Sequence, residues 1–271
     1  MADDDLSDFE HTSFAPPNGK ERSVFRKGTG PAVVVTAELP GITPAVADFA
    51  RRIADLGCTA VLPHLFGTPG RDPDAGRIAG LAYGLSSMVP ACVSREFTTW
   101  ATGRTSPVVE WLRALASHEH ARCGGPGVGA VGMCFTGGFA LAMAADPVLV
   151  APVLSQPSLP FGVRRRQRES IDCSPDDLAA VKRRCAAEGL EVLGLRFRGD
   201  RFVPPERFEM LARELGDAFV AVELDAESAN PDARMKPHSV LTEHLIDAPG
   251  EPTREALDRV LDHLRSRLLD Q

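Results

Sequence analysis

The chain has 271 residues, of which 44% are hydrophobic and 25% are charged. This composition is ordinary for a globular protein with a sizeable core, and it excludes a disordered chain, a collagen-like repeat and a small disulfide scaffold. The formal net charge of −7 argues against nucleic acid or an anionic membrane surface as the main partner.

The acidic start, Met1 to Asp5, lacks the basic-then-apolar order of a secretory signal. No stretch approaches the roughly 18 to 20 apolar residues that cross a bilayer. We therefore expect a cytoplasmic protein with no membrane partner. The six cysteines include no C-x-x-C pair, so free thiols are expected in that compartment.

Residues 1–8 are polar and are expected to be frayed, whereas residues 9–271 are expected to form one domain. Strands and helices then alternate at least five times, which predicts the α/β class, with a predominantly parallel sheet and helices on both faces. No period is evident between residues 67 and 84. The predicted strands are 9–14, 21–27, 32–36, 59–63, 127–133, 148–154, 190–198 and 219–224, and the predicted helices are 42–56, 107–117, 136–145, 175–188, 205–215 and 253–269.

The segment Val131–Gly138 joins a buried strand to an alanine-rich helix. A nucleophile elbow needs this arrangement, because a tight turn lifts the reactive side chain above the sheet and small neighbours let strand and helix approach. Cys134 stands at that turn, where a helix N-terminus favours a thiolate. The N–H of Phe135 would be free to face an oxyanion.

A buried structural cysteine in a glycine-rich turn is the alternative interpretation of Cys134. A phosphate-binding loop is disfavoured, because the glycines do not match G-x-G-x-x-G with a following acidic residue and no Walker A lysine is present.

A thiol nucleophile is best helped by a histidine that a carboxylate orients. Asp200 follows the strand predicted at 190–198, and His238 lies in a loop after the last predicted strand. Each position is at the carboxyl end of a strand, where parallel sheets carry their sites. Taken alone, Asp200 could cap a helix and His238 could be a solvated loop residue. Together with Cys134 they predict a Cys-His-Asp triad.

The other histidines are placed less well. His118 and His120 are two residues apart, so they face different sides of a helix and make a poor metal pair. His64 stands at a strand end and His244 lies close to His238, which leaves both as weaker competitors.

Four motifs in order give the chain a family resemblance, from about residue 9 to the C-terminus. They are Glu38-x-x-Gly41 after a strand, the elbow at Cys134, Gly199-Asp200 with Val203-Pro204, and His238-Ser239. With them the sequence resembles the dienelactone hydrolase family, whose members have the α/β-hydrolase fold.

The resemblance implies that Glu38 contacts the resting thiol and helps to generate the thiolate, and a carboxylate beside a thiol can accept its proton. It also implies that the N–H of Leu39 joins that of Phe135 in an oxyanion hole.

Departures from the family pattern concern the elbow and the substrate. Thr136 stands where the family has the first of two glycines, and Thr242 stands where it has an arginine that holds a substrate carboxylate. Arg95 and Arg104 are candidate substitutes for that arginine. A possible lid lies near residues 156–188, although the basic run at 164–168 is also typical of a solvated loop.

These features predict a cofactor-independent hydrolase of a small carboxylic ester or lactone, with no metal, acting as a monomer or homodimer. The alternatives are a thiol-based redox protein or a non-catalytic small-molecule-binding protein, and a zinc hydrolase that uses His118, His120 and a carboxylate.

Overall fold

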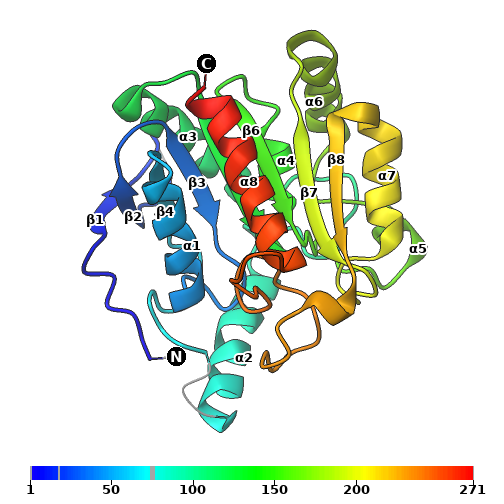
Figure 1. Ribbon diagram of the computed structural model, residues 1–271. Coiled ribbons are helices and arrows are strands. Elements are labelled where there is room, and N and C mark those ends of the chain that lie inside the picture. Colours follow the sequence, from blue (N-terminus) through cyan, green and yellow to red (C-terminus); the bar gives the residue numbers. More distant parts are fainter. Residues whose placement is uncertain (1, 18, 74–76, 271) are drawn as a thin grey trace.

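The computed structural model describes residues 2–17, 19–73 and 77–270 and shows an eight-stranded sheet in the order β1-β2-β4-β3-β5-β6-β7-β8 (Figure 1). β2 pairs antiparallel with β1 and β4, and all later neighbours are parallel. The predicted α/β-hydrolase fold, with a mostly parallel sheet, is confirmed. The strands are β1 (Glu10–Phe14), β2 (Arg22–Gly28), β3 (Ala32–Thr36), β4 (Thr59–Pro63), β5 (Val128–Met133), β6 (Leu149–Ser155), β7 (Val192–Phe197) and β8 (Phe219–Leu224).

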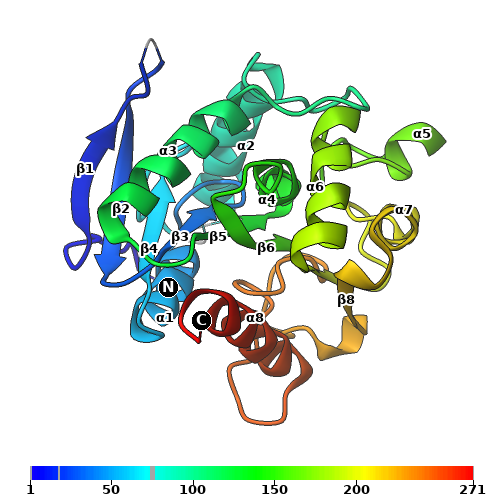
Figure 2. The same cartoon turned by 90° about the horizontal axis from the view of Figure 1, so that it is seen from above.

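Helices cover both faces of this sheet, as the view from above shows (Figure 2). α1 (Pro44–Asp55) and α8 (Pro252–Leu268) lie on one face. The other face carries α3 (Val108–Cys123), α4 (Phe139–Met143), α6 (Pro175–Glu188) and α7 (Pro205–Leu215). The central strands β3 and β5 are buried along their whole length, which explains their apolar residues on both faces.

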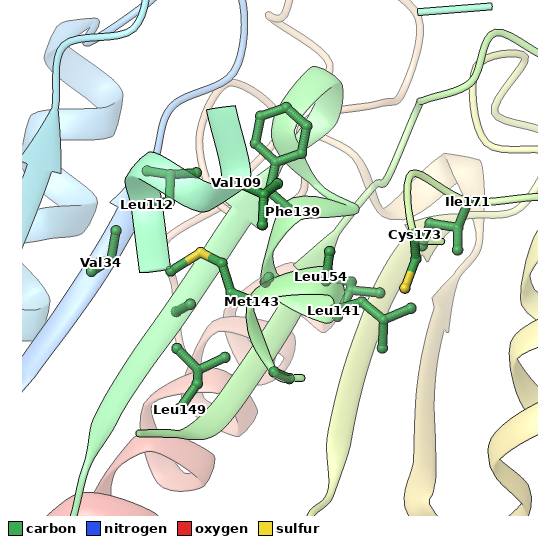
Figure 3. Packing of buried hydrophobic residues seen from close by; sticks show 14 of the residues in the cluster. Val34, Val109, Leu112, Phe139, Leu141, Met143, Leu149, Leu154, Ile171 and Cys173 are labelled. Carbon is green, nitrogen blue, oxygen red and sulfur yellow. The ribbon is translucent and has the colours of Figure 1, made fainter. Parts of the chain in front are cut away.

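The short helix α4 packs in the core against β6, α3 and α6, and Figure 3 shows its buried side chains. Phe139, Leu141 and Met143 are each at most 1% exposed. The sequence predicts a helix over 136–145, but the regular α-helix is shorter, because the first turn is a 3-10 turn at Cys134–Thr136. The nucleophile candidate is therefore held at the junction of a buried strand and a buried helix.

The helix that follows β4 was not predicted. α2 (Arg77–Val93) falls partly in the region without a clear period, and it contains Pro90. Residues 74–76 of that region lie outside the described residues. A proline lowers the intrinsic helix propensity of a segment, so tertiary context rather than local sequence determines this helix.

Residues 2–8, expected to be frayed, are instead held against α1, and Met1 lies outside the described residues. Leu6 is 5% exposed, and Asp4 accepts a hydrogen bond from Arg51 at 2.8 Å. Arg51 also bonds Asp8 at 2.8 Å. Two of the acidic residues in this segment, Asp4 and Asp8, thus have a cationic partner on α1.

The expected lid, 156–188, divides into two parts. α6 is a flanking helix that packs on α4 and α7. The part before it contains a short helix, α5 (Arg165–Arg168), whose Arg165 is exposed and pairs with Glu169 at 2.8 Å. Within the described ranges, no helix is both long and apolar enough to cross a membrane.

Candidate active site

Cys134 occupies a strained turn directly after β5. Its φ angle is +51°, in the left-handed region that residues with a Cβ rarely adopt. Phe135 and Thr136 beside it are at most 1% exposed, whereas Cys134 is only partly buried. The turn therefore presents the sulfur while burying its neighbours, as a nucleophile elbow does.

Two glycines allow the chain to approach this closely. A Cβ at Gly132 would lie 2.4 Å from the carbonyl oxygen of Thr136, and one at Gly137 would lie 2.5 Å from the Cα of Pro157. Both distances are far inside van der Waals contact, so larger residues would push the elbow away from its surroundings.

Thr136, the departure from the family pattern, anchors the elbow to β3. Its hydroxyl lies 2.7 Å from the carbonyl oxygen of Thr36 and accepts a hydrogen bond from the N–H of Met133 at 3.1 Å. Because β3 leads directly into Glu38 and Leu39, this side chain couples the cysteine turn to the strand that carries the other candidate residues.

Asp200 and His238 meet although 38 positions separate them in the sequence. His238 Nδ1 lies 2.6 Å from Asp200 Oδ2, and both side chains are buried. The N–H of Phe202 donates to Asp200 Oδ1 at 2.9 Å, which fixes the carboxylate. An aspartate that accepts from Nδ1–H leaves the other ring nitrogen as the one that exchanges protons.

His238 faces Cys134. Burial alone would lower the pKa of His238, but the charges of Cys134 and Asp200 and their hydrogen bonds raise it well above the usual value. His238 Nε2 is buried and has no well-aligned hydrogen bond to any residue that the structure describes. Cys134 is thus among the groups that raise the pKa of His238, and the free Nε2 of the imidazole is available for proton transfer.

Glu38 is buried and held by three neutral donors. Its Oε2 accepts from Ser239 Oγ at 2.6 Å and from Gln156 Nε2 at 3.1 Å, and its Oε1 accepts from Thr242 Oγ1. The contact with the thiol that the resemblance implies is not among these hydrogen bonds. Thr242 stands in place of the family's arginine, and its uncharged hydroxyl donates the hydrogen bond to Glu38 Oε1.

The sulfur instead has a hydroxyl neighbour. Ser158 Oγ lies 3.6 Å from Cys134 Sγ, and the N–H of Ser158 donates to the carbonyl oxygen of Cys134 at 2.9 Å. Ser158 is 1% exposed. It belongs to the loop after β6, which was expected to contribute only as part of a lid.

The two oxyanion candidates lie at the starts of the loops after β3 and β5. Phe135 belongs to the first turn of the short 3-10 helix, where N–H groups have no partner within the helix. Leu39 is partly exposed in the turn after β3, and its N–H makes no hydrogen bond within the described part of the chain. Both groups are therefore free to donate to a ligand.

Arg95 and Arg104 line a separate hollow of about 670 Å³, together with Phe97 and Trp100. Neither Cys134 nor His238 lines this hollow. One lining residue, Phe97, contacts the elbow, since its ring centroid lies 5.2 Å from that of Phe135. The structure thus brings the two arginines together with each other but not with the proposed triad.

The other cysteines and His118 have surroundings of their own. All six cysteines are free thiols, and burial raises the pKa of Cys58 to about 11. In the ranges described, no group of three or more His, Cys, Asp or Glu side chains could hold a metal ion. His118 instead lies against the ring of Phe14, with centroids 5.0 Å apart.

Some residues of the site belong to none of the sequence motifs. Gln156 is fully buried and joins Glu38 to the backbone N–H of Val240 at 3.4 Å. His244, a competitor in the sequence, supports the histidine loop by accepting from the N–H of Ser239 at 3.2 Å. Polar residues directly after β6 could have been noticed, because every parallel strand ends at this edge.

Comparison with known proteins bears on the family and the fold of this chain. The sequence profile of the dienelactone hydrolase family matches residues 22–160, just over half of the chain. No curated protein matches the sequence.

Solved structures of other proteins share the fold, and three of them illustrate the likeness. A dienelactone hydrolase-like promiscuous phosphotriesterase from metagenomic libraries has a TM-score of 0.60 at 17% identity, covering 96% of this chain and 98% of that one. A zinc-bound cold-adapted esterase from an Arctic intertidal metagenomic library has a TM-score of 0.54 at 15% identity, covering 99% and 98%. A puromycin hydrolase has a TM-score of 0.57 at 14% identity, covering 96% and 39%.

Proposed function

Because the chain belongs to the dienelactone hydrolase family, we propose that it hydrolyses a small carboxylic ester or lactone with Cys134 as nucleophile and without a cofactor. The observation that carries this proposal is the buried Asp200–His238 pair, 2.6 Å apart, beside the partly exposed sulfur of an elbow. A positioned carboxylate, imidazole and nucleophile are the three parts that acyl transfer requires.

Acylation begins with the thiolate of Cys134 and protonated His238. The sulfur bonds to the substrate carbonyl carbon, and the oxygen takes the electron pair and accepts hydrogen bonds from the N–H groups of Leu39 and Phe135. When the carbonyl re-forms, the bond to the alcohol oxygen breaks, and His238 gives its proton to that leaving group. The product is a thioester on Cys134 and a neutral His238.

Deacylation uses the same groups with water as the nucleophile. Neutral His238 takes a proton from water as the oxygen bonds to the thioester carbon. The collapsing intermediate expels the Cys134 thiolate and releases the acid, while Asp200 stabilises the imidazolium that has formed. The resting ion pair is restored.

We assign the deprotonation of Cys134 to His238 rather than to Glu38. The Glu38 carboxylate accepts hydrogen bonds from two residues of the histidine loop, Ser239 and Thr242. In this arrangement it holds that loop against the strand ends. Because no hydrogen bond joins Glu38 to the sulfur in the described part of the chain, we treat Glu38 as a support for the base rather than as the base itself.

The preferred substrate is expected to be uncharged near the reacting carbonyl. Thr242 supplies no positive charge beside the site, and the exposed ring of Phe202 lies 5.3 Å from that of His238. An apolar acyl or alcohol group would pack on this ring.

The test is p-nitrophenyl acetate hydrolysis by folded Cys134→Ala and His238→Ala proteins. Each should lose all measurable turnover, whereas Cys185→Ala, on α6, serves as the control and should retain it. Turnover at the wild-type rate in Cys134→Ala would overturn the proposal. A wild-type protein without ester turnover, but with a peroxide-driven disulfide at Cys134, would favour the redox alternative.

A further inference from the structure

We propose that Ser158 is a further catalytic residue, whose hydroxyl donates a hydrogen bond to the thiolate of Cys134. The inference rests on the proposed function, because it needs Cys134 to be the nucleophile. It assigns a chemical role to the loop after β6, which none of the sequence motifs includes.

Two contacts fix Ser158 beside the sulfur. Its N–H donates to the carbonyl oxygen of Cys134 at 2.9 Å, and its Oγ lies 3.6 Å from Cys134 Sγ. The first contact sets the spacing of the two residues, and the second directs the hydroxyl at the reacting atom. At 1% exposure, Ser158 is screened from water that would compete for this bond.

The hydroxyl of Ser158 can donate its proton to either of two acceptors, the sulfur of Cys134 or the carbonyl oxygen of Gln156. Ser158 Oγ is also 3.0 Å from the carbonyl oxygen of Gln156, and a serine has one proton to donate. A neutral thiol or thioester sulfur is a weak acceptor, so the carbonyl oxygen then receives the proton. A thiolate is a much stronger acceptor, because hydrogen bonds to charged groups are about twice as strong as neutral ones.

The acceptor that the hydroxyl of Ser158 bonds therefore changes with the charge on the sulfur during the reaction. The hydroxyl turns to sulfur in the resting ion pair and turns back to Gln156 when the thioester forms. It returns to sulfur when the second tetrahedral intermediate expels the thiolate. Ser158 therefore raises the fraction of reactive thiolate and assists its departure from the acyl-enzyme.

A buried arginine holds this loop in place. Arg207, on α7, is 0% exposed and donates to the carbonyl oxygens of Pro157 and Pro160, each at 2.6 Å. These two residues flank Ser158 and Leu159. Arg207 also donates to the carbonyl oxygen of Ser170 at 2.6 Å, so it is a positioning residue for the whole turn.

The charged groups near Cys134 must be considered in any titration. His238 faces the sulfur, Asp200 lies behind that imidazole, and Glu38 is held in the adjacent network. All three remain in a Ser158 variant. A change in the titration of Cys134 on removal of the hydroxyl therefore reports the hydrogen bond itself.

The test is the rate of Cys134 alkylation by iodoacetamide from pH 4 to 10, followed by mass spectrometry at that residue. In Ser158→Ala the midpoint should rise by about one pH unit, with a fall on the order of tenfold in rate at the lower pH values. Ser158→Thr keeps a hydroxyl and should restore most of the shift. Thermal unfolding of each variant shows whether it is folded.

A Ser158→Ala profile that overlays the wild-type profile would overturn the inference, as would a Ser158→Thr profile equal to that of alanine in folded protein. Both outcomes leave the proposed function intact, because that is tested separately by turnover of Cys134→Ala. Retained turnover in Cys134→Ala would instead remove the premise.

The role of Arg207 has its own measurement. Arg207→Lys keeps a charge but loses the planar fork that reaches several carbonyls. We expect a smaller rise in the alkylation midpoint and no added rise in combination with Ser158→Ala, since Arg207 acts through Ser158. Additive shifts would contradict that assignment.

Discussion

The two halves of the proposed site are built differently. The elbow side consists of consecutive residues, Gly132 to Gly138, whose positions follow from backbone geometry and close packing. The base side draws residues from the loops after β3, β6, β7 and β8, and hydrogen bonds between side chains hold them together. Close packing of residues adjacent in sequence thus determines the elbow side, whereas hydrogen bonds between residues distant in sequence determine the base side.

This difference determines how each half should fail. The elbow is close-packed, so a larger residue at one of its glycines should affect folding as well as activity. A polar network can lose one member and still fold, because the other hydrogen bonds remain. Damage to the elbow should therefore reduce stability, whereas damage to the base side should reduce turnover in a folded protein.

The largest combined effect is expected for Gly137→Val. The new Cβ would lie 2.5 Å from the Cα of Pro157, which is backbone and cannot rotate away. We expect the free energy of unfolding to fall by roughly 3 kcal/mol or more, with loss of turnover. Chemical denaturation measures the free energy of unfolding, and ester hydrolysis measures turnover.

Gly84→Ala is the matched control, because a Cβ there meets nothing within 4 Å. It should leave stability and turnover close to those of the wild type. A Gly137→Val protein as stable and active as this control would show that the elbow is not sterically fixed.

The base side is broken most directly by Asp200→Asn. The variant should remain folded, but turnover should fall by roughly 100-fold to 10,000-fold, because the imidazolium loses its charged partner. Loss of the Asp200 carboxylate also lowers the pKa of His238, since that charge helps to raise it. The pH–rate profile should therefore show the loss of the imidazolium at a lower pH than in the wild type.

Asp225→Asn provides the comparison, because Asp225 is an exposed acid that pairs with Arg198 at 3.1 Å near the end of β8. It should leave turnover unchanged. Equal turnover in Asp200→Asn and Asp225→Asn would argue that the buried pair is structural.

A smaller effect, on stability alone, is expected at Asp172, a buried carboxyl outside the proposed triad. The N–H of Ser106 donates to it at 2.7 Å, and burial raises its pKa to about 7. In the unfolded chain the carboxyl ionises near pH 4, but in the folded protein it stays protonated until about pH 7. The free energy of unfolding therefore falls as pH rises between these values.

Asp172→Asn, which resembles the protonated acid, should remove this dependence. The difference in stability between variant and wild type should grow by up to about 4 kcal/mol from pH 4 to pH 7.5. Denaturation at several pH values measures it. Parallel curves for the two proteins would show that Asp172 does not titrate in this range.

The same contrast explains what could be predicted from sequence. The strand boundaries at Ala32–Thr36 and Thr59–Pro63 match the prediction, since short, mostly apolar runs that contain β-branched residues are typical of buried strands. Cys134 stood out because an elbow is encoded in adjacent residues. The helix Arg77–Val93 was missed, because its sequence lacks a clear amphipathic pattern.

Residues that act through distant partners left no such pattern. Ser158 and Gln156 look like ordinary loop residues until β6 is placed next to β5. Glu38 was noticed only through the family resemblance, and its partner Thr242 only as a missing arginine. Long-range hydrogen bonds depend on register and loop course, which local composition does not determine.

The most direct test of the central claim is to identify the residue that carries the acyl group. Wild-type protein turning over p-nitrophenyl acetate is quenched in acid, digested and examined by mass spectrometry. The account predicts one acetyl group on the peptide that contains Cys134, located on its sulfur. An acetyl group on Ser158 or another residue, with Cys134 unmodified, would contradict it.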